Sequence, residues 1–168
     1  PFFINGGCQL CFGRGEILEN IHQNLDYGVL LVKNPNVSIS TPETYKKYSL
    51  KYSHKYDVRN NVVENIRNDL REKGINRLGV ENKSINIQND LQMVVEKEDS
   101  SVKTALDLLS NLEDSLTFSM SGSGPTCYAL FKNVHYANRA LEHNYKIFKN
   151  KGFDLWVCKF INKGIEFI

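Results

Sequence analysis

The middle of the chain has the residue spacing of amphipathic helices. Over residues 57–73 four apolar side chains recur at every fourth position and share one helical face: Val58, Val62, Ile66 and Leu70. Asp57 can cap the start of this helix. Shorter helices are predicted around residues 87–95 and 102–112, the second capped by Ser100 or Ser101.

An earlier helix is predicted to begin at Thr41. The Thr41 hydroxyl can cap the first turn, Pro42 suits an early helical position, and Glu43 favours the positive end of the helix dipole. Residues 48–56 are rich in Lys, Ser and Tyr and lack a regular apolar spacing. We therefore expect a surface loop over residues 48–56.

Four segments have the pattern of β-strands: residues 29–33, 115–120, 126–132 and 153–161. The first is a continuous apolar run, as in a buried strand. In the second, apolar residues alternate with small polar ones, which predicts that Leu116, Phe118 and Met120 face a core. A helix over residues 134–148 is expected to turn four apolar residues inward: Ala137, Ala140, Leu141 and Ile147. The order of elements predicts an α+β fold, an antiparallel sheet that carries its helices on one face.

The first 18 residues hold two short apolar runs, residues 2–4 and 8–12. Gly6-Gly7 between them suits a hairpin turn, and residues 13–16, Gly-Arg-Gly-Glu, end the second run. The chain begins with Pro1 rather than Met, and an apolar run follows at once. We therefore expect a C-terminal piece of a longer protein.

Composition narrows the class of protein. With 168 residues and 41% apolar content, the chain suits one globular domain, or one domain with part of a neighbour. A net charge of +2 does not favour nucleic acid or a membrane surface, and no apolar run approaches the ~20 residues of a membrane-spanning helix. The cysteines are expected to be free thiols in a reducing cytosol: Cys8, Cys11, Cys127 and Cys158.

No metal site is predicted from the sequence. Cys8 and Cys11 have the spacing of half a zinc site, but a second pair of ligands at matching spacing is missing. The histidines are scattered along the chain. Surface positions explain the histidines, and an apolar strand explains the two cysteines.

The segment with the strongest chemical signal is residues 121–125, Ser-Gly-Ser-Gly-Pro, between two predicted strands. Its glycines allow backbone N–H groups to converge on an anion, or another backbone to approach closely. Neither Ser121 nor Ser123 has the flanking glycines of a nucleophile elbow, and no Walker motif occurs. A long glycine-rich hairpin turn explains the residues equally well.

Several of these segments occur in the order of a known family. They are Pro1-Phe2-Phe3, Gly13-Arg14-Gly15-Glu16, residues 37–42 (Val-Ser-Ile-Ser-Thr-Pro), Tyr45, Asn89-Asp90-Leu91 and residues 120–126. Together they resemble the C-terminal part of the 4-diphosphocytidyl-2-C-methyl-D-erythritol kinases, a family of the GHMP kinase superfamily. These kinases phosphorylate, with ATP, the 2-hydroxyl of a cytidine-diphosphate-linked methylerythritol in the non-mevalonate isoprenoid route of bacteria and plastids.

The resemblance implies a domain organisation. Residues 1–20 would end the first domain of a two-domain enzyme, and residues 21–168 would form a ferredoxin-like GHMP C-terminal domain. The ATP-binding glycine loop of the family is absent from this sequence, and the catalytic aspartate would stand just before Pro1. No catalytic residue is therefore expected in the chain, which would be inactive alone. ATP and Mg would act in the full-length enzyme, in the cytoplasm or the plastid stroma.

The resemblance also implies site residues. Tyr45 occupies the position of an aromatic ring that stacks on cytosine, and Thr41 that of a threonine lining the nucleotide pocket. Residues 121–124 (Ser121, Gly122, Ser123 and Gly124) correspond to the third GHMP motif, which supports the phosphate loop. Two alternatives remain open: another small-molecule GHMP kinase, such as a homoserine kinase, with no preference for cytidine, and a non-catalytic ferredoxin-like binding module.

Overall fold

The computed structural model describes residues 5–21, 26–56, 64, 65, 68 and 88–165. The elements before residue 60 are β1 (Cys8–Phe12), β2 (Ile17–Ile21), β3 (Gly28–Lys33), α2 (Thr41–Tyr52) and a 3₁₀ turn η1 (Ser53–Tyr56). The later ones are α4 (Gln92–Glu98), α5 (Ser100–Ser110), β4 (Ser115–Met120), β5 (Cys127–Phe131), α6 (Val134–Asn150) and β6 (Asp154–Lys159).

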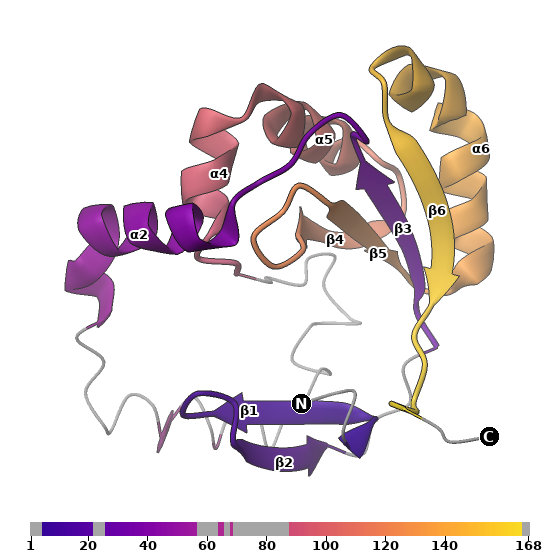
Figure 1. Cartoon of the computed structure of the whole chain (residues 1–168). Helices are drawn as coiled ribbons and strands as arrows, with labels where there is room; N and C mark the ends of the chain where they lie inside the picture. Colours follow the sequence, from indigo (N-terminus) through magenta and orange to yellow (C-terminus); the bar gives the residue numbers. More distant parts are fainter. Residues whose placement is uncertain (1–4, 22–25, 57–63, 66–67, 69–87, 166–168) are drawn as a thin grey trace.

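Strands β3 to β6 form one antiparallel sheet in the order β4-β5-β3-β6 (Figure 1). Strand β3 pairs on both sides, so that Leu30 lies opposite Ala129 of β5 and opposite Val157 of β6. Strand β4 completes the sheet by pairing with β5. The four predicted strands and their antiparallel arrangement are confirmed, with ends shifted by at most two residues.

One face of this sheet packs against α5 and α6 and forms the core. Alternate residues of β3 and β5 supply its completely buried centre: Leu30, Val32, Cys127, Ala129 and Phe131. The helices contribute Val102, Leu106 and Leu109 from α5 and Ala137, Ala140 and Phe148 from α6. This arrangement confirms the predicted α+β fold with helices on one face of the sheet.

The alternation predicted for β4 holds only in part. Met120 is buried and Phe118 packs partly against the core, but Leu116 remains half-buried outside it. A register shift between Ser115 and Thr117 interrupts the regular pairing of β4 with β5, which breaks the two-residue period there. Buried Ser119 is hydrogen-bonded through its hydroxyl.

The prediction of a surface loop over residues 48–56 is wrong. Helix α2 continues to Tyr52 and is followed by the turn η1. Its buried positions, Thr44 and Tyr48, are one helical turn apart, and Tyr48 is only 3% exposed. The exposed lysines and serines around them hide this narrow inward stripe from a periodicity analysis.

Helix ends also differ from the prediction. The side chain of Asp99, not Ser100 or Ser101, caps α5 by accepting a hydrogen bond from the Val102 N–H. Helix α6 runs to Asn150 and buries Phe148, whereas Ile147 is half exposed instead of inward. The predicted helix over residues 57–73 lies outside the described residues, apart from three of its positions.

Strands β1 and β2 form a separate two-stranded hairpin (Figure 1). Their turn is made by residues 13–16, where Gly13 and Gly15 adopt positive φ angles. The apolar run at residues 2–4, predicted to pair with β1, lies outside the described residues. The Gly7 N–H donates to the Asn162 carbonyl at 2.8 Å, which connects this hairpin to the segment after β6.

The described helices include none that is both long and apolar enough to cross a membrane. Across the same residues, no three His, Cys, Asp or Glu side chains converge as metal ligands would. The four cysteines are free thiols, as expected.

Candidate functional site

The glycine–serine loop, residues 121–125, joins β4 to β5. It is closed at its base by a hydrogen bond from the Ser121 N–H to the Thr126 carbonyl, and internally by one from the Gly124 N–H to the Ser121 carbonyl. Gly122 and Gly124 have φ angles of 56° and 81°, which L side chains rarely adopt. A Cβ at Gly124 would also lie 2.8 Å from Sδ of Met120. The loop therefore depends on glycine at these positions.

The first turn of α2 lies against this loop. The Thr41 hydroxyl is 2.7 Å from the Ser123 hydroxyl, although 82 residues separate them in sequence. Thr41 is not the helix cap expected from the sequence, because Ser40 occupies the cap position and makes no side-chain capping bond. The Thr41 hydroxyl instead joins the start of α2 to the loop.

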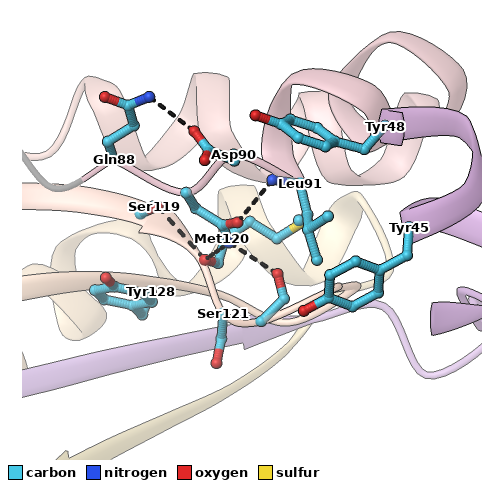
Figure 2. Close-up of a pocket in the computed structure, with 11 residues that line it drawn as sticks. Tyr45, Tyr48, Gln88, Asp90, Leu91, Ser119, Met120, Ser121 and Tyr128 are labelled. Atoms are coloured by element: carbon cyan, nitrogen blue, oxygen red, sulfur yellow. Dashed lines mark hydrogen bonds between the residues drawn. The ribbon is translucent and has the colours of Figure 1, made fainter. Parts of the chain in front are cut away.

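A pocket of about 520 Å³ opens between α2, the start of α4 and the glycine–serine loop (Figure 2). Its lining residues are Tyr45, Tyr48, Gln88, Asn89, Asp90, Leu91, Ser119, Met120, Ser121, Gly122 and Tyr128. Three of the six site residues predicted from the sequence are among them: Tyr45, Ser121 and Gly122. The other three lie on the adjoining part of the loop or at the start of α2, so the structure brings all six together.

Two tyrosines of α2 line the pocket in different ways. Tyr48 is 3% exposed, belongs to the core and packs its ring against Tyr52 at a centroid distance of 5.4 Å. Tyr45 is 56% exposed and projects from the preceding turn of the helix toward the pocket (Figure 2). Of the two rings, Tyr45 is therefore the one available to a ligand.

The pocket lining carries little charge. Among the described lining residues Asp90 carries the one carboxylate, and its Oδ1 accepts a hydrogen bond from Gln88 Nε2 at 2.8 Å. None of the described residues that line the pocket is a lysine or an arginine. Burial raises the pKa of Tyr128, so that the phenol stays protonated near neutral pH and can donate a hydrogen bond. Aromatic rings with neutral donors and acceptors suit a nucleobase or a sugar better than a phosphate chain.

Sequence reasoning missed the residues that frame this pocket. Asn89 appeared only as part of a family resemblance, without a role, and Tyr48 was assigned to a surface loop. In the structure Asn89 donates to the carbonyls of Met120 and Gly122, more than 30 residues away in sequence. Such long-range contacts have no local pattern; the one local signal was an asparagine just before a helix.

The comparisons with known proteins agree with this architecture. Residues 62–150, more than half of the chain, match the family model described as GHMP kinases C terminal. The chain belongs to the GHMP kinases. The resemblance found in the sequence and the fold predicted from it are thereby confirmed.

The curated relatives carry a more specific name. A 4-diphosphocytidyl-2-C-methyl-D-erythritol kinase of Prochlorococcus marinus strain MIT 9312 is 62% identical over all 168 residues. The protein of the same name from strain NATL1A is 41% identical over 167 residues. The chain spans about half the length of these relatives, 54% and 52% respectively.

Solved structures share the fold at low sequence identity. A homoserine kinase from Cytophaga hutchinsonii matches with a TM-score of 0.61 and 18% identity, over 97% of this chain and 51% of the other. A 4-(cytidine 5'-diphospho)-2C-methyl-D-erythritol kinase matches with a TM-score of 0.51 and 21% identity, over 86% and 46%. In both cases this chain corresponds to about half of the GHMP kinase chain.

Proposed function

We propose that the full-length protein, of which this chain forms the C-terminal part, is an ATP-dependent kinase. It phosphorylates the 2-hydroxyl of 4-diphosphocytidyl-2-C-methyl-D-erythritol in the non-mevalonate isoprenoid route. Residues 1–20 belong to the end of its N-terminal domain and residues 21–168 form its C-terminal domain. The observation that carries this proposal is the exposed Tyr45 ring in a pocket beside the glycine–serine loop. The name of the curated relatives supplies the substrate.

In this proposal the pocket binds the cytidine end of the substrate. The Tyr45 ring stacks on the base, since every nucleobase has an aromatic face that such a ring can cover. Tyr128 lines the pocket and offers its phenol hydroxyl, whereas the buried Ser119 hydroxyl already donates to Gln92. Thr41 holds the start of α2 against the loop, which fixes the direction in which Tyr45 projects.

ATP and Mg belong to another part of the full-length protein. The described lining residues do not suit a triphosphate, because none of them is cationic and the Asp90 carboxylate would repel the phosphates. Phosphoryl transfer needs bound phosphates, a metal ion and a group that orients the attacking hydroxyl. The glycine–serine loop contributes indirectly, by supporting the phosphate loop of the N-terminal domain.

Two consequences follow for the chain and for the cell. Residues 1–168 alone carry no phosphoryl transfer, because the nucleotide loop and the catalytic aspartate of the family are not among them. The full-length protein works in the cytoplasm, or in the plastid stroma, on a small soluble substrate and without nucleic acid or membrane partners.

The test is an assay of the purified full-length protein with ATP and Mg. We expect turnover of the cytidine-linked substrate, little or none of homoserine, and none of either by residues 1–168 alone. Turnover of homoserine with no preference for the cytidine-linked compound would establish the homoserine kinase alternative. No turnover of any alcohol, together with retained small-molecule binding, would establish a non-catalytic module.

A further inference from the structure

Two side-chain amides from the start of α4 hold the end of strand β4. Asn89, three residues before the helix, donates from Nδ2 to the Met120 carbonyl at 2.7 Å and to the Gly122 carbonyl at 2.8 Å. Its Oδ1 accepts from the Leu91 N–H at 3.0 Å. Three hydrogen bonds therefore fix both the position and the orientation of this amide.

Gln92, in the first turn of α4, completes the arrangement from the other side. Its Oε1 accepts from the Met120 N–H at 2.9 Å and from the Ser119 hydroxyl at 3.0 Å. Both backbone polar groups of Met120 are thus bonded to side-chain amides. Strand β4 lies at the edge of the sheet, where outward-facing backbone groups have no neighbouring strand to pair with.

On the pocket side, few other contacts among the described residues fix the conformation of the glycine–serine loop. Gly122 is exposed and has open space around the position of a Cβ. Side-chain packing therefore does not set the path of the loop at this residue. The Asn89 donor on the Gly122 carbonyl does so from one side, and the Thr41 hydroxyl on Ser123 from the other.

We propose that Asn89 and Gln92 form an amide clamp that sets the conformation of the glycine–serine loop, with Asn89 a positioning residue for ATP turnover. The second part rests on the proposed kinase function. Asn89 does not touch the reacting atoms in this scheme. It keeps the loop in the shape that supports the phosphate loop, and small displacements of a supporting segment slow a transfer that depends on alignment.

The clamp predicts an asymmetry between its two amides. Asn89 acts on the loop as a donor, and an aspartate at this position cannot donate. Gln92 acts on β4 as an acceptor, and a glutamate keeps that ability. Its second oxygen replaces the 3.3 Å contact to Glu96 by a repulsion between two carboxylates, which acts within α4 and not on the loop. The same amide-to-acid change should therefore release the loop at residue 89 and leave it closed at residue 92.

Hydrogen exchange on the full-length protein tests the clamp without requiring activity. In Asn89→Asp, the loop amides of Ser121 and Gly124 should exchange about tenfold faster or more, as two lost hydrogen bonds allow, while β3 amides stay protected. Gln92→Glu should exchange like the wild type. The loop amides of Asn144→Asp should also exchange like those of the wild type, because this variant loses a comparable amide-to-carbonyl bond inside α6, away from the pocket. Asn89→Ser serves as the second variant if Asn89→Asp does not fold.

Turnover tests the positioning role. Asn89→Asp should lower kcat/KM for ATP about tenfold or more, whereas Asn144→Asp should leave it unchanged. Equal loop exchange in Asn89→Asp and the wild type, or equal acceleration in Gln92→Glu, would overturn the clamp. Faster loop exchange with unchanged kcat/KM would overturn the positioning role. A wild-type protein without kinase activity would refute the proposed function and this role, while the exchange result would still decide the clamp.

Discussion

Replacement of Tyr45 separates recognition of the substrate from stability of the fold. The ring is 56% exposed, so its removal leaves no cavity in the core. Exposed substitutions of this kind usually change the free energy of unfolding by no more than about 0.5 kcal/mol. A ring stacked on a base contributes ~1–3 kcal/mol to its binding. The two effects therefore differ enough to be measured separately.

In the full-length protein, Tyr45→Ala should raise KM for the cytidine-linked substrate by ~10-fold or more, since about 1.4 kcal/mol corresponds to a factor of ten. KM for ATP should barely change, because in the proposed function ATP binds in the N-terminal domain and not in this pocket. Tyr45→Phe keeps the ring and should be nearly silent. The assay combines steady-state kinetics for both substrates with thermal unfolding of each variant.

Two further tyrosines supply the controls. Tyr145 on α6 is 50% exposed and does not line the pocket, so Tyr145→Ala should change neither KM nor stability. Tyr48 is 3% exposed in the core, and Tyr48→Ala should lower the free energy of unfolding by about 3–5 kcal/mol, as for other buried aromatic residues. The reasoning is refuted if Tyr45→Ala destabilises the protein as Tyr48→Ala does while KM for the cytidine-linked substrate stays unchanged.

Three further expectations follow from the structure. The Thr41 and Ser123 hydroxyls are 2.7 Å apart, so a double-mutant cycle of Thr41→Val and Ser123→Ala should give a coupling of about 0.5 kcal/mol or more in the free energy of unfolding. A coupling of zero would contradict a stabilising contact between the two hydroxyls. Gly28→Ala places a Cβ too close to the Asn133 carbonyl oxygen and should lower the free energy of unfolding by about 1–3 kcal/mol in urea titrations. Wild-type stability of this variant would contradict the close approach of the two backbones. Cys127 is fully buried, and burial raises its pKa to about 12, so that about one thiol in ten thousand is ionised at pH 8. Alkylation followed by mass spectrometry should therefore label Cys127 only after unfolding. Labelling of the native protein at Cys127 as fast as at half-buried Cys158 would contradict this.

Local sequence patterns were sufficient to predict the sheet and most of its helices. The continuous apolar run around Leu30 and the helical spacing of apolar residues before β6 are patterns formed by residues close together in sequence. The errors fall where long-range packing decides. Tyr48 is buried by an element far away in sequence, and the register shift in β4 turns Leu116 away from the core. Neither effect leaves a periodic signal in the segment where it occurs.

The pocket was accessible from the sequence only through family resemblance. Tyr45 on a helix and Ser121 in a glycine-rich turn are individually unremarkable, and no spacing rule brings α2 and the β4–β5 loop together. The structure shows the contact, through Thr41 and Ser123, and adds Asn89, which resemblance alone left without a role. We propose that Tyr45 binds the substrate and that Asn89 positions the loop, and the kinetic tests above address both roles.

The contacts that shape the pocket differ in kind from those that hold the fold. Tyr48, Gly28 and Cys127 lie in or beside the buried core, where a change in volume costs stability. Tyr45, Thr41 and Asn89 act at the exposed end of the sheet, through one ring and a few hydrogen bonds. Because Tyr45 and Thr41 are exposed, their contacts contribute little to the free energy of unfolding. Variants of Tyr48, Gly28 and Cys127 should therefore lose stability first, whereas Tyr45→Ala should raise KM for the cytidine-linked substrate at nearly unchanged stability.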